Sequence, residues 1–183
     1  VESIDEVSAK FKLYPFQKDI IKSYVNNRYV IVKCSRQVGK TVTTGAFVLW
    51  SVIFQANYKV LLLGNNLETA MTIMEKMQFT YEKLPQWMNQ GIKAWNKKSV
   101  LLENKSAIKA STTTSKSGRS GTYNLVILEE FAFVEQNIAE DFIASVFPVI
   151  SSGKTSKLLM ISTPNGYNHF FKFWDEAKGG TNG

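Results

Sequence analysis

The stretch that decides the fold is residues 30–50, VIVKCSRQVGKTVTTGAFVLW. It contains a β-branched run, then a polar segment with one glycine, then an apolar run. Tyr29–Val32 predicts a buried strand, and Thr41–Ile53 has the length and apolar content of a helix. A polar loop between a strand and a helix is the setting of a phosphate-binding loop.

The polar segment matches most of the phosphate-binding pattern G-x-x-x-x-G-K-[ST], but Cys34 stands where the first glycine is usual. In such loops backbone N–H groups surround the phosphates, the lysine reaches the outer phosphates, and the hydroxyl binds Mg²⁺. The alternative is an ordinary strand-to-helix turn that happens to contain Gly-Lys-Thr. The residues predicted to hold the phosphates of a nucleotide are Ser35, Arg36, Gln37, Val38, Gly39, Lys40 and Thr41.

The composition fits one globular domain. The chain has 183 residues, of which 44% are hydrophobic and 20% charged, which is enough for a core of its own. Lysine and arginine outnumber aspartate and glutamate by 22 to 15, giving a net charge of +7. This excess favours a polyanionic partner such as nucleic acid, and a solvated basic surface is the alternative.

The cysteine and histidine content and the lengths of the apolar runs disfavour disulfide-bonded proteins, enzymes with a nucleophilic thiol, and membrane-spanning or secreted proteins. Cys34 is the only cysteine, so it forms no internal disulfide, which predicts a reducing compartment. The only histidine, His169, is distant in sequence, which argues against a nucleophilic thiol. No apolar run reaches the ~18 residues of a membrane span, and the first residues do not resemble a signal peptide. We expect a soluble intracellular protein that does not contact a membrane.

Strands and helices alternate along the chain. This pattern predicts an α/β fold with a mostly parallel central sheet flanked by helices, plus a small β-hairpin insertion, as one domain over 1–183. The predicted helices are Ser8–Asn26, Thr41–Ile53, Glu68–Leu84 and Ala139–Val146. The predicted strands are Tyr29–Val32, Lys59–Leu63, Ser99–Glu103, Ala107–Ala110, Leu125–Leu128 and Leu158–Ser162.

A second chemical feature is residues 124–133, NLVILEEFAF, an apolar strand that ends in two carboxylates. This is the pattern of a Walker B element, because the first carboxylate, Glu129, can hold Mg²⁺ and the second, Glu130, can orient and deprotonate water. In an open parallel sheet both would emerge at the carboxyl edge, where ligands bind. The alternative is a strand that leaves the core at a polar turn.

Four stretches in this order carry a family resemblance: YPFQKDII, SRQVGKT, LVILEEFAF and STPNGYNHFFKFW. Together they resemble the ATPase half of the large terminase subunit of tailed bacteriophages. Members of that family also lack the first glycine of the loop, which would explain Cys34. The resemblance implies a P-loop NTPase of the additional-strand, RecA-like type. In that type another strand separates the phosphate-loop and Walker B strands, and our candidate is Leu158–Ser162.

The resemblance also implies roles for residues beyond the phosphate loop. Tyr14 and Gln17 match the adenine-recognising motif, where a glutamine amide can pair with the base edge; an ordinary helix start after Pro15 is the alternative. Arg36 resembles an arginine that senses the γ-phosphate. Arg119 resembles an arginine that acts on a neighbouring subunit's ATP, with a solvated loop arginine as the alternative.

Ser162 and Thr163 match the motif that couples hydrolysis to movement, and a plain Ser-Thr-Pro turn is the alternative. The aromatic segment His169–Trp174 would then be a lever or its packing surface. One departure concerns Glu129, because the family usually has aspartate there and the longer side chain changes the Mg²⁺ geometry. Another concerns extent, because the chain stops at EAKGGTNG without the acidic cluster of the family's C-terminal nuclease. We therefore expect no DNA cutting, and the glycine-rich tail suits a fragment boundary.

The resemblance thus predicts an ATP- and Mg²⁺-dependent motor domain that drives double-stranded DNA into a prohead. It implies portal protein and small terminase subunit as partners, a homo-oligomeric ring, expected to be a pentamer, and the host cytoplasm as the location. For the isolated chain a monomer is the alternative. Two rival functions stay open: a helicase-like P-loop ATPase acting on nucleic acid, and a nucleotide-binding module without turnover. Glu130 argues against the second.

Overall fold

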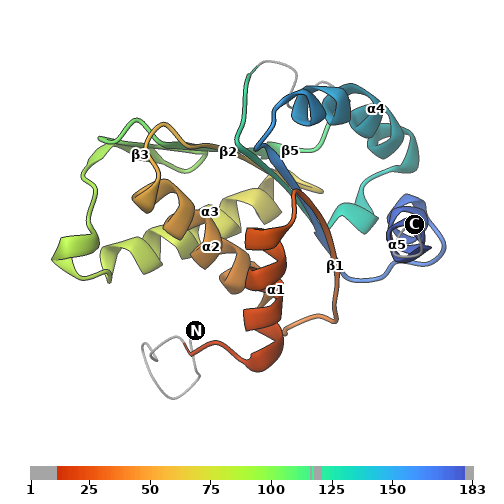
Figure 1. The fold of residues 1–183 in the computed structure, drawn as a ribbon, viewed down its shortest axis with the longest axis horizontal. Coiled ribbons are helices and arrows are strands. Elements are labelled where there is room, and N and C mark those ends of the chain that lie inside the picture. Colours follow the sequence, from red (N-terminus) through yellow and green to blue (C-terminus); the bar gives the residue numbers. More distant parts are fainter. Residues whose placement is uncertain (1–11, 116, 118–120, 180–183) are drawn as a thin grey trace.

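The structure, a computed structural model, describes residues 12–115, 117 and 121–179. Helices alternate with strands through most of it (Figure 1). The helices are α1 (Pro15–Asn26), α2 (Lys40–Phe54), α3 (Leu67–Glu82), α4 (Gln136–Ser152) and α5 (His169–Gly179), with 3₁₀ turns η1 (Gln86–Met88) and η2 (Phe131–Phe133). The strands are β1 (Tyr29–Lys33), β2 (Lys59–Gly64), β3 (Ile92–Asn96), β4 (Ser99–Leu102), β5 (Ala107–Thr112), β6 (Leu125–Glu129) and β7 (Lys157–Ser162).

The described strands form one seven-stranded sheet in the order β1-β7-β6-β2-β5-β4-β3. The first five strands of this order run parallel, and β4 and β3 run antiparallel to their neighbours. Strand β7 lies between β1 and β6, so the predicted additional strand is confirmed. The predicted α/β class with a mostly parallel sheet is confirmed with it.

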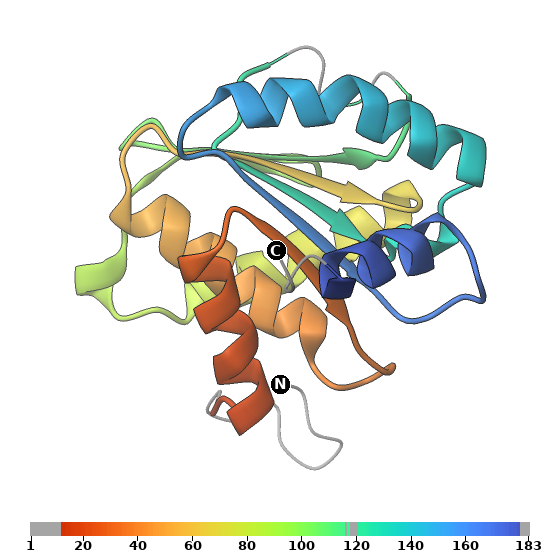
Figure 2. The ribbon, with the colours of Figure 1, turned by 45° about the vertical axis from the view of Figure 1, so that its right-hand side comes forward.

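Helices cover both faces of the sheet. α1, α2 and α3 lie on one face, and α4 and α5 lie on the other (Figures 1 and 2). Because successive side chains of a strand point to opposite faces, β2 supplies both cores. Val60 and Leu62 pack with the first three helices, whereas Leu61 and Leu63 pack with α4 and α5. This double burial explains the uninterrupted apolar run of β2.

The predicted hairpin is present but is larger than expected and belongs to the main sheet. β4 and β5 pair antiparallel as predicted, and β5 also pairs with β2 in parallel from Lys59↔Ala107 to Gly64↔Thr112. A third strand, β3, pairs with β4. The sequence does not predict β3 because it has little burial of its own and is held by pairing with β4.

Two helices also differ from the expectation. α4 continues through Pro148 to Ser152, beyond the predicted end at Val146, although proline removes a helical hydrogen bond. Burial of Val146 and Ile150 against the sheet outweighs that loss. His169–Gly179, expected only as an aromatic segment, is helix α5. Among the described helices, none is both long and apolar enough to cross a membrane.

Two cations join the start of β1 and of β7 to the ends of helices. Arg28 donates to the carbonyls of Ile150, Gly153 and Ser156, at and beyond the end of α4. Lys157 donates at 2.7–2.8 Å to the carbonyls of Tyr24, Val25 and Asn27, at the end of α1. The carbonyls at a helix C-terminus lack intrahelical donors and carry partial negative charge, so both cations are well placed.

We predict that Lys157→Met lowers the free energy of unfolding by about 1.5–3 kcal/mol, the usual range for hydrogen bonds to a charged group. Methionine keeps most of the apolar stem but removes all three donors to α1. The measurement is urea denaturation followed by circular dichroism. Lys154→Met, at an exposed lysine three residues earlier, is the control and should change the midpoint little. Equal midpoints for the two variants would contradict this role of Lys157.

Candidate nucleotide site

The predicted phosphate loop lies at the edge of the sheet where the parallel strands end. It leaves β1 after Lys33 and enters α2 at Lys40. Beside it is a cleft of about 570 Å³. The residues that line the cleft are Arg36, Gln37, Gly39, Lys40, Thr41, Val42, Asn65, Thr69, Lys76, Glu130 and Phe133. Strands β1, β2 and β6 therefore all contribute to one site through the segments that follow them.

The loop is held in a left-handed backbone conformation at two positions, Gln37 with φ of 59° and Gly39 with φ of 76°. A Cβ at Gly39 would lie 2.6 Å from Gln17 Nε2, so the Gln17 amide would have to move to admit a side chain there. Cys34 opens the loop, and its backbone N–H donates to the Ser162 carbonyl at 3.3 Å. Burial raises the pKa of its thiol, which gives no support to a nucleophile.

Gln17 lies in α1 and is buried against the loop. Its Nε2 donates to the Val38 carbonyl at 3.1 Å, and its Oε1 accepts from the Tyr14 backbone N–H at 3.0 Å. The amide therefore ties α1 to the loop. The Tyr14 ring is exposed, stacks on Phe16 and does not line the cleft. Adenine recognition by this pair stays a prediction.

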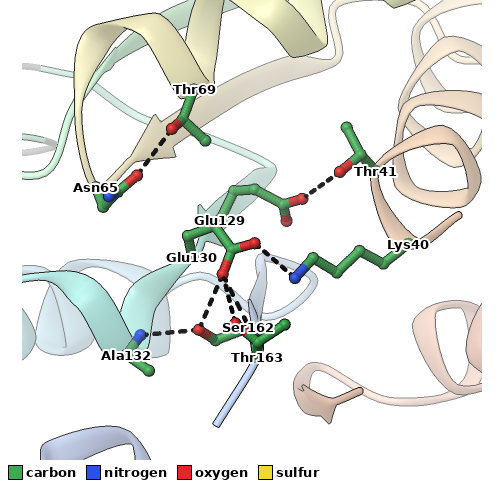
Figure 3. A network of polar contacts seen from close by, with 9 residues as sticks. All are labelled: Lys40, Thr41, Asn65, Thr69, Glu129, Glu130, Ala132, Ser162 and Thr163. Carbon is green, nitrogen blue, oxygen red and sulfur yellow. Dashed lines mark hydrogen bonds and ion pairs between the residues drawn. The ribbon is translucent and has the colours of Figure 1, made fainter. Parts of the chain in front are cut away.

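Glu129 is buried and faces the first turn of α2. Its Oε1 accepts from the Thr41 hydroxyl at 2.9 Å (Figure 3), and its Oε2 has no hydrogen-bond partner among the residues that the structure describes. Burial raises the pKa of this carboxyl to about 7, against the hydrogen bond from Thr41 and the charge of Lys40, which lower it. A buried carboxylate oxygen without a partner, next to a hydroxyl, fits a hard cation such as Mg²⁺. Thr41 and Glu129 are the residues that would hold it.

Glu130 occupies a different environment from its neighbour. Its backbone is left-handed, with φ of 53°, an uncommon conformation for a residue other than glycine. The Lys40 ammonium lies 2.6 Å from Glu130 Oε1, as an ion pair without regular hydrogen-bond geometry. Glu130 Oε2 is 3.3–3.4 Å from the hydroxyls of Ser162 and Thr163 and from the Thr163 backbone N–H (Figure 3).

The turn after Glu130 is fastened to the segment after β7. The Ala132 N–H donates to the Ser162 hydroxyl at 3.1 Å. The Ala132 carbonyl accepts from the side-chain amides of Asn165 and Asn168, at 3.0 and 2.7 Å. His169 Nε2 lies 2.8 Å from the Phe131 carbonyl. The histidine is therefore a buried structural contact between this turn and α5.

The structure brings together most of the residues that the sequence singled out. These residues make two neighbouring sets of contacts: Thr41 with Glu129, and Glu130 with Lys40 and the β7 hydroxyls (Figure 3). Of the remaining predicted residues, Arg36, Gln37 and Gly39 line the cleft, whereas Ser35 and Val38 do not. Arg119 falls outside the described residues. The roles assigned to all of them stay predictions.

Three polar residues of the cleft were not among the predicted site residues: Asn65, Thr69 and Lys76. The sequence could have indicated Asn65 as a site residue, because it follows an apolar strand at the same sheet edge as the two carboxylates. No sequence pattern indicated Thr69 or Lys76, since they lie on a helix whose orientation depends on packing. Among the described residues, no group of three His, Cys, Asp or Glu side chains could form a metal cluster.

The raised pKa of Glu129 predicts pH-dependent stability when nucleotide and Mg²⁺ are absent. Its folded pKa exceeds the ordinary value, so this group's contribution is complete below pH 4.5 and is lost as pH rises through about 7. We expect the free energy of unfolding to fall by on the order of 2–3 kcal/mol over this range through Glu129. Urea denaturation in EDTA at several pH values measures it.

Glu129→Gln should flatten this part of the pH dependence, because glutamine stays neutral and can still accept from Thr41. Glu140→Gln, at an exposed glutamate of α4, is the matched control and should keep the wild-type profile. If Glu129→Gln retains the full fall between pH 5 and 8, the carboxylate is already ionised in the folded chain and the prediction is wrong.

Similar folds occur in solved structures of phage proteins. The Thermus phage P74-26 large terminase ATPase domain is 18% identical, with a TM-score of 0.74 over 89% of this chain and 69% of that one. The HK97 bacteriophage large terminase is 21% identical, with a TM-score of 0.80 over 96% and 38%. The large terminase of the thermophilic bacteriophage D6E, in complex with ADP, is 15% identical, with a TM-score of 0.69 over 91% and 43%. At these identities the likeness concerns the fold.

The family itself follows from the sequence. A family model described as terminase large subunit, T4likevirus-type, N-terminal, matches residues 31–179. This range includes the phosphate loop, the carboxylate pair and the β7 hydroxyls. The resemblance drawn from the four sequence stretches is confirmed, and the chain belongs to the family of N-terminal domains of T4likevirus-type terminase large subunits.

Proposed function

We propose that this chain is the ATP-hydrolysing motor domain of a viral DNA-packaging terminase, which couples hydrolysis to translocation of double-stranded DNA into a prohead. The observation that carries the proposal is the position of Glu130, which contacts both the loop lysine and the hydroxyls of β7. One carboxylate thus touches a phosphate-binding group and a candidate coupling group. Family membership favours this function over a helicase-like ATPase.

The residues of the cleft divide the work of hydrolysis between them. The loop N–H groups and Lys40 would bind the β- and γ-phosphates, with Arg36 at the exposed side of the cleft. Mg²⁺ held by Thr41 and Glu129 would neutralise phosphate charge. Lys40 would exchange Glu130 for phosphate oxygens. Glu130 would then be free to orient water and accept its proton. The ADP complex of the D6E terminase supports nucleotide binding by this fold.

Coupling would begin at Glu130, because the hydroxyls of Ser162 and Thr163 contact its carboxylate. Any shift of that carboxylate changes the contacts at the end of β7. The segment that follows is fastened to the Ala132 carbonyl and leads into α5. The shift that follows a change of charge at the γ-phosphate position would thus be transmitted to α5 through a few successive contacts.

The wider assembly is part of the same proposal. The net charge of +7 suits a DNA partner. Portal protein and small terminase subunit are the proposed protein partners, in the host cytoplasm, with the motor working as a ring of five subunits. In such a ring Arg119 would reach a neighbouring subunit's ATP. The isolated chain would then be a weak ATPase, because an arginine supplied in trans can be worth ~10³ or more in rate.

Two substitutions test the site. Lys40→Ala should weaken ATP binding and hydrolysis together, because it removes the phosphate ligand. Glu130→Gln should abolish hydrolysis while binding stays within a few-fold of wild type, because only the base is lost. Phosphate release and binding of a fluorescent ATP analogue are the two measurements. Glu135→Gln, at an exposed glutamate, is the matched control. Normal hydrolysis by Glu130→Gln would disprove the proposed mechanism.

The double variant Ser162→Ala, Thr163→Ala tests coupling in a full-length protein that carries this domain. It should leave ATP binding within a few-fold of wild type but abolish DNA translocation, because no hydroxyl would remain to contact the Glu130 carboxylate and move with it. The measurement is DNA packaging by purified motors. Thr163→Ser keeps a hydroxyl and should retain much more translocation than the double variant. Translocation at the normal rate by the double variant would refute the coupling role.

A further inference from the structure

Two polar side chains at the start of α3 line the cleft without a role in the function proposed above. Asn65 directly follows β2, and Thr69 is in the first turn of α3. The Thr69 hydroxyl donates to Asn65 Oδ1 at 2.9 Å (Figure 3). The pair faces the carboxylates from the side of the cleft opposite β7.

Asn65 and Glu130 follow the ends of two neighbouring strands. Gly64, the last residue of β2, pairs with Glu129, the last residue of β6, so Asn65 and Glu130 are the first residues beyond these two strand ends. On the other flank of β6, Glu129 pairs with Ile161, so Ser162 is next there. Glu130 is thus flanked by the Ser162 hydroxyl at the end of β7 and by the Asn65 amide after β2. The β7 hydroxyls contact the Glu130 carboxylate, and the amide on the β2 side is available for another interaction.

The backbone before Asn65 allows little variation. A Cβ at Gly64 would lie 2.5 Å from the Asn66 carbonyl oxygen and 2.9 Å from the Ala70 nitrogen. Glycine therefore permits the abrupt turn from β2 into α3. The Gly64 carbonyl also accepts from the Thr113 N–H at 2.9 Å. Gly64, the residue before Asn65, is consequently held in place at the start of the turn.

The hydrogen bond from Thr69 also fixes which end of the Asn65 amide is available. Oδ1 is engaged, and within the described part of the chain Nδ2 has no acceptor. A neutral amide N–H can bond a water oxygen but cannot take its proton. In phosphoryl transfer a base or a water-positioning residue orients the nucleophile, and an amide N–H can serve as such a positioning group beside a base. Asn65 has this chemistry in the same cleft as Glu130.

We propose that Asn65 is a further catalytic residue, whose Nδ2 donates to the attacking water, and that Thr69 is its positioning residue. The proposal rests on the function proposed above. In the step, the water oxygen bonds to the γ-phosphorus and a water proton passes to Glu130. The bond from the γ-phosphorus to the β–γ bridging oxygen breaks, and its electron pair leaves with ADP.

The test is single-turnover hydrolysis of ATP with Mg²⁺ by this chain, beside binding of a non-hydrolysable ATP analogue. Asn65→Ala should lower the rate by about 10- to 100-fold, toward the range seen when one transition-state donor is removed. Analogue binding should stay within about two-fold, because the bonded water is not part of the nucleotide. Thr69→Val should lose part of the rate, and Thr69→Ser should recover most of that loss.

Asn66→Ala is the matched control for damage to the helix start. Asn66 is exposed, caps α3 through the Thr69 N–H and does not line the cleft, so this variant should lose stability but not rate. Wild-type rate in Asn65→Ala, while Glu130→Gln is inactive, would overturn this inference alone. Equal loss in Asn66→Ala and Asn65→Ala, or a binding loss that accounts for the rate, would also overturn it. Normal hydrolysis by Glu130→Gln would overturn the proposed function and this inference together.

Discussion

The ion pair between Lys40 and Glu130 is the contact on which the site depends. Lys40 is 7% exposed, and a buried ammonium without an anion would cost several kcal/mol. In the absence of phosphate, Glu130 provides that anion at 2.6 Å. In the proposed function a phosphate group would bring stronger charge to the same lysine, so phosphate and carboxylate would compete for it. Glu130, the proposed base, would then be held by the lysine until a nucleotide replaces it.

The position of β7 makes this contact possible. With one strand between them, β1 and β6 are two strand spacings apart, roughly 9.5 Å. That gap is wide enough for phosphates, and the long lysine side chain spans it. The same intervening strand ends at Ser162, and Thr163 follows. The hydroxyls of both residues contact the Glu130 carboxylate. If β1 and β6 were neighbours, the cleft would be narrower and no hydroxyls would lie between them.

The parts of the site that the sequence predicts are those set by local order along the chain. A loop between a strand and a helix, and two carboxylates after an apolar strand, are readable without neighbours. The place of β7 needed the family resemblance, because strand order is a non-local property. β3 was missed because its residues are mostly exposed and it is held by pairing with β4. Asn65 was missed although its position after an apolar strand could have indicated it. The predicted role of Gln17 at adenine stays a prediction, and its amide bond to the Val38 carbonyl, between residues 21 apart, could not be read from the sequence.

Helix α5 contacts both β1, which leads into the phosphate loop, and the turn η2, which follows Glu130. At its start, His169 lies 2.8 Å from the Phe131 carbonyl, just after Glu130. Further along, the Trp174 ring lies 3.3 Å from Lys33 Nζ, one residue before Cys34 opens the phosphate loop. The aromatic character of this segment follows from these two contacts and from burial of Phe170. Because α5 is attached to the carboxylate turn and to the loop strand, any change in their separation must be taken up by α5.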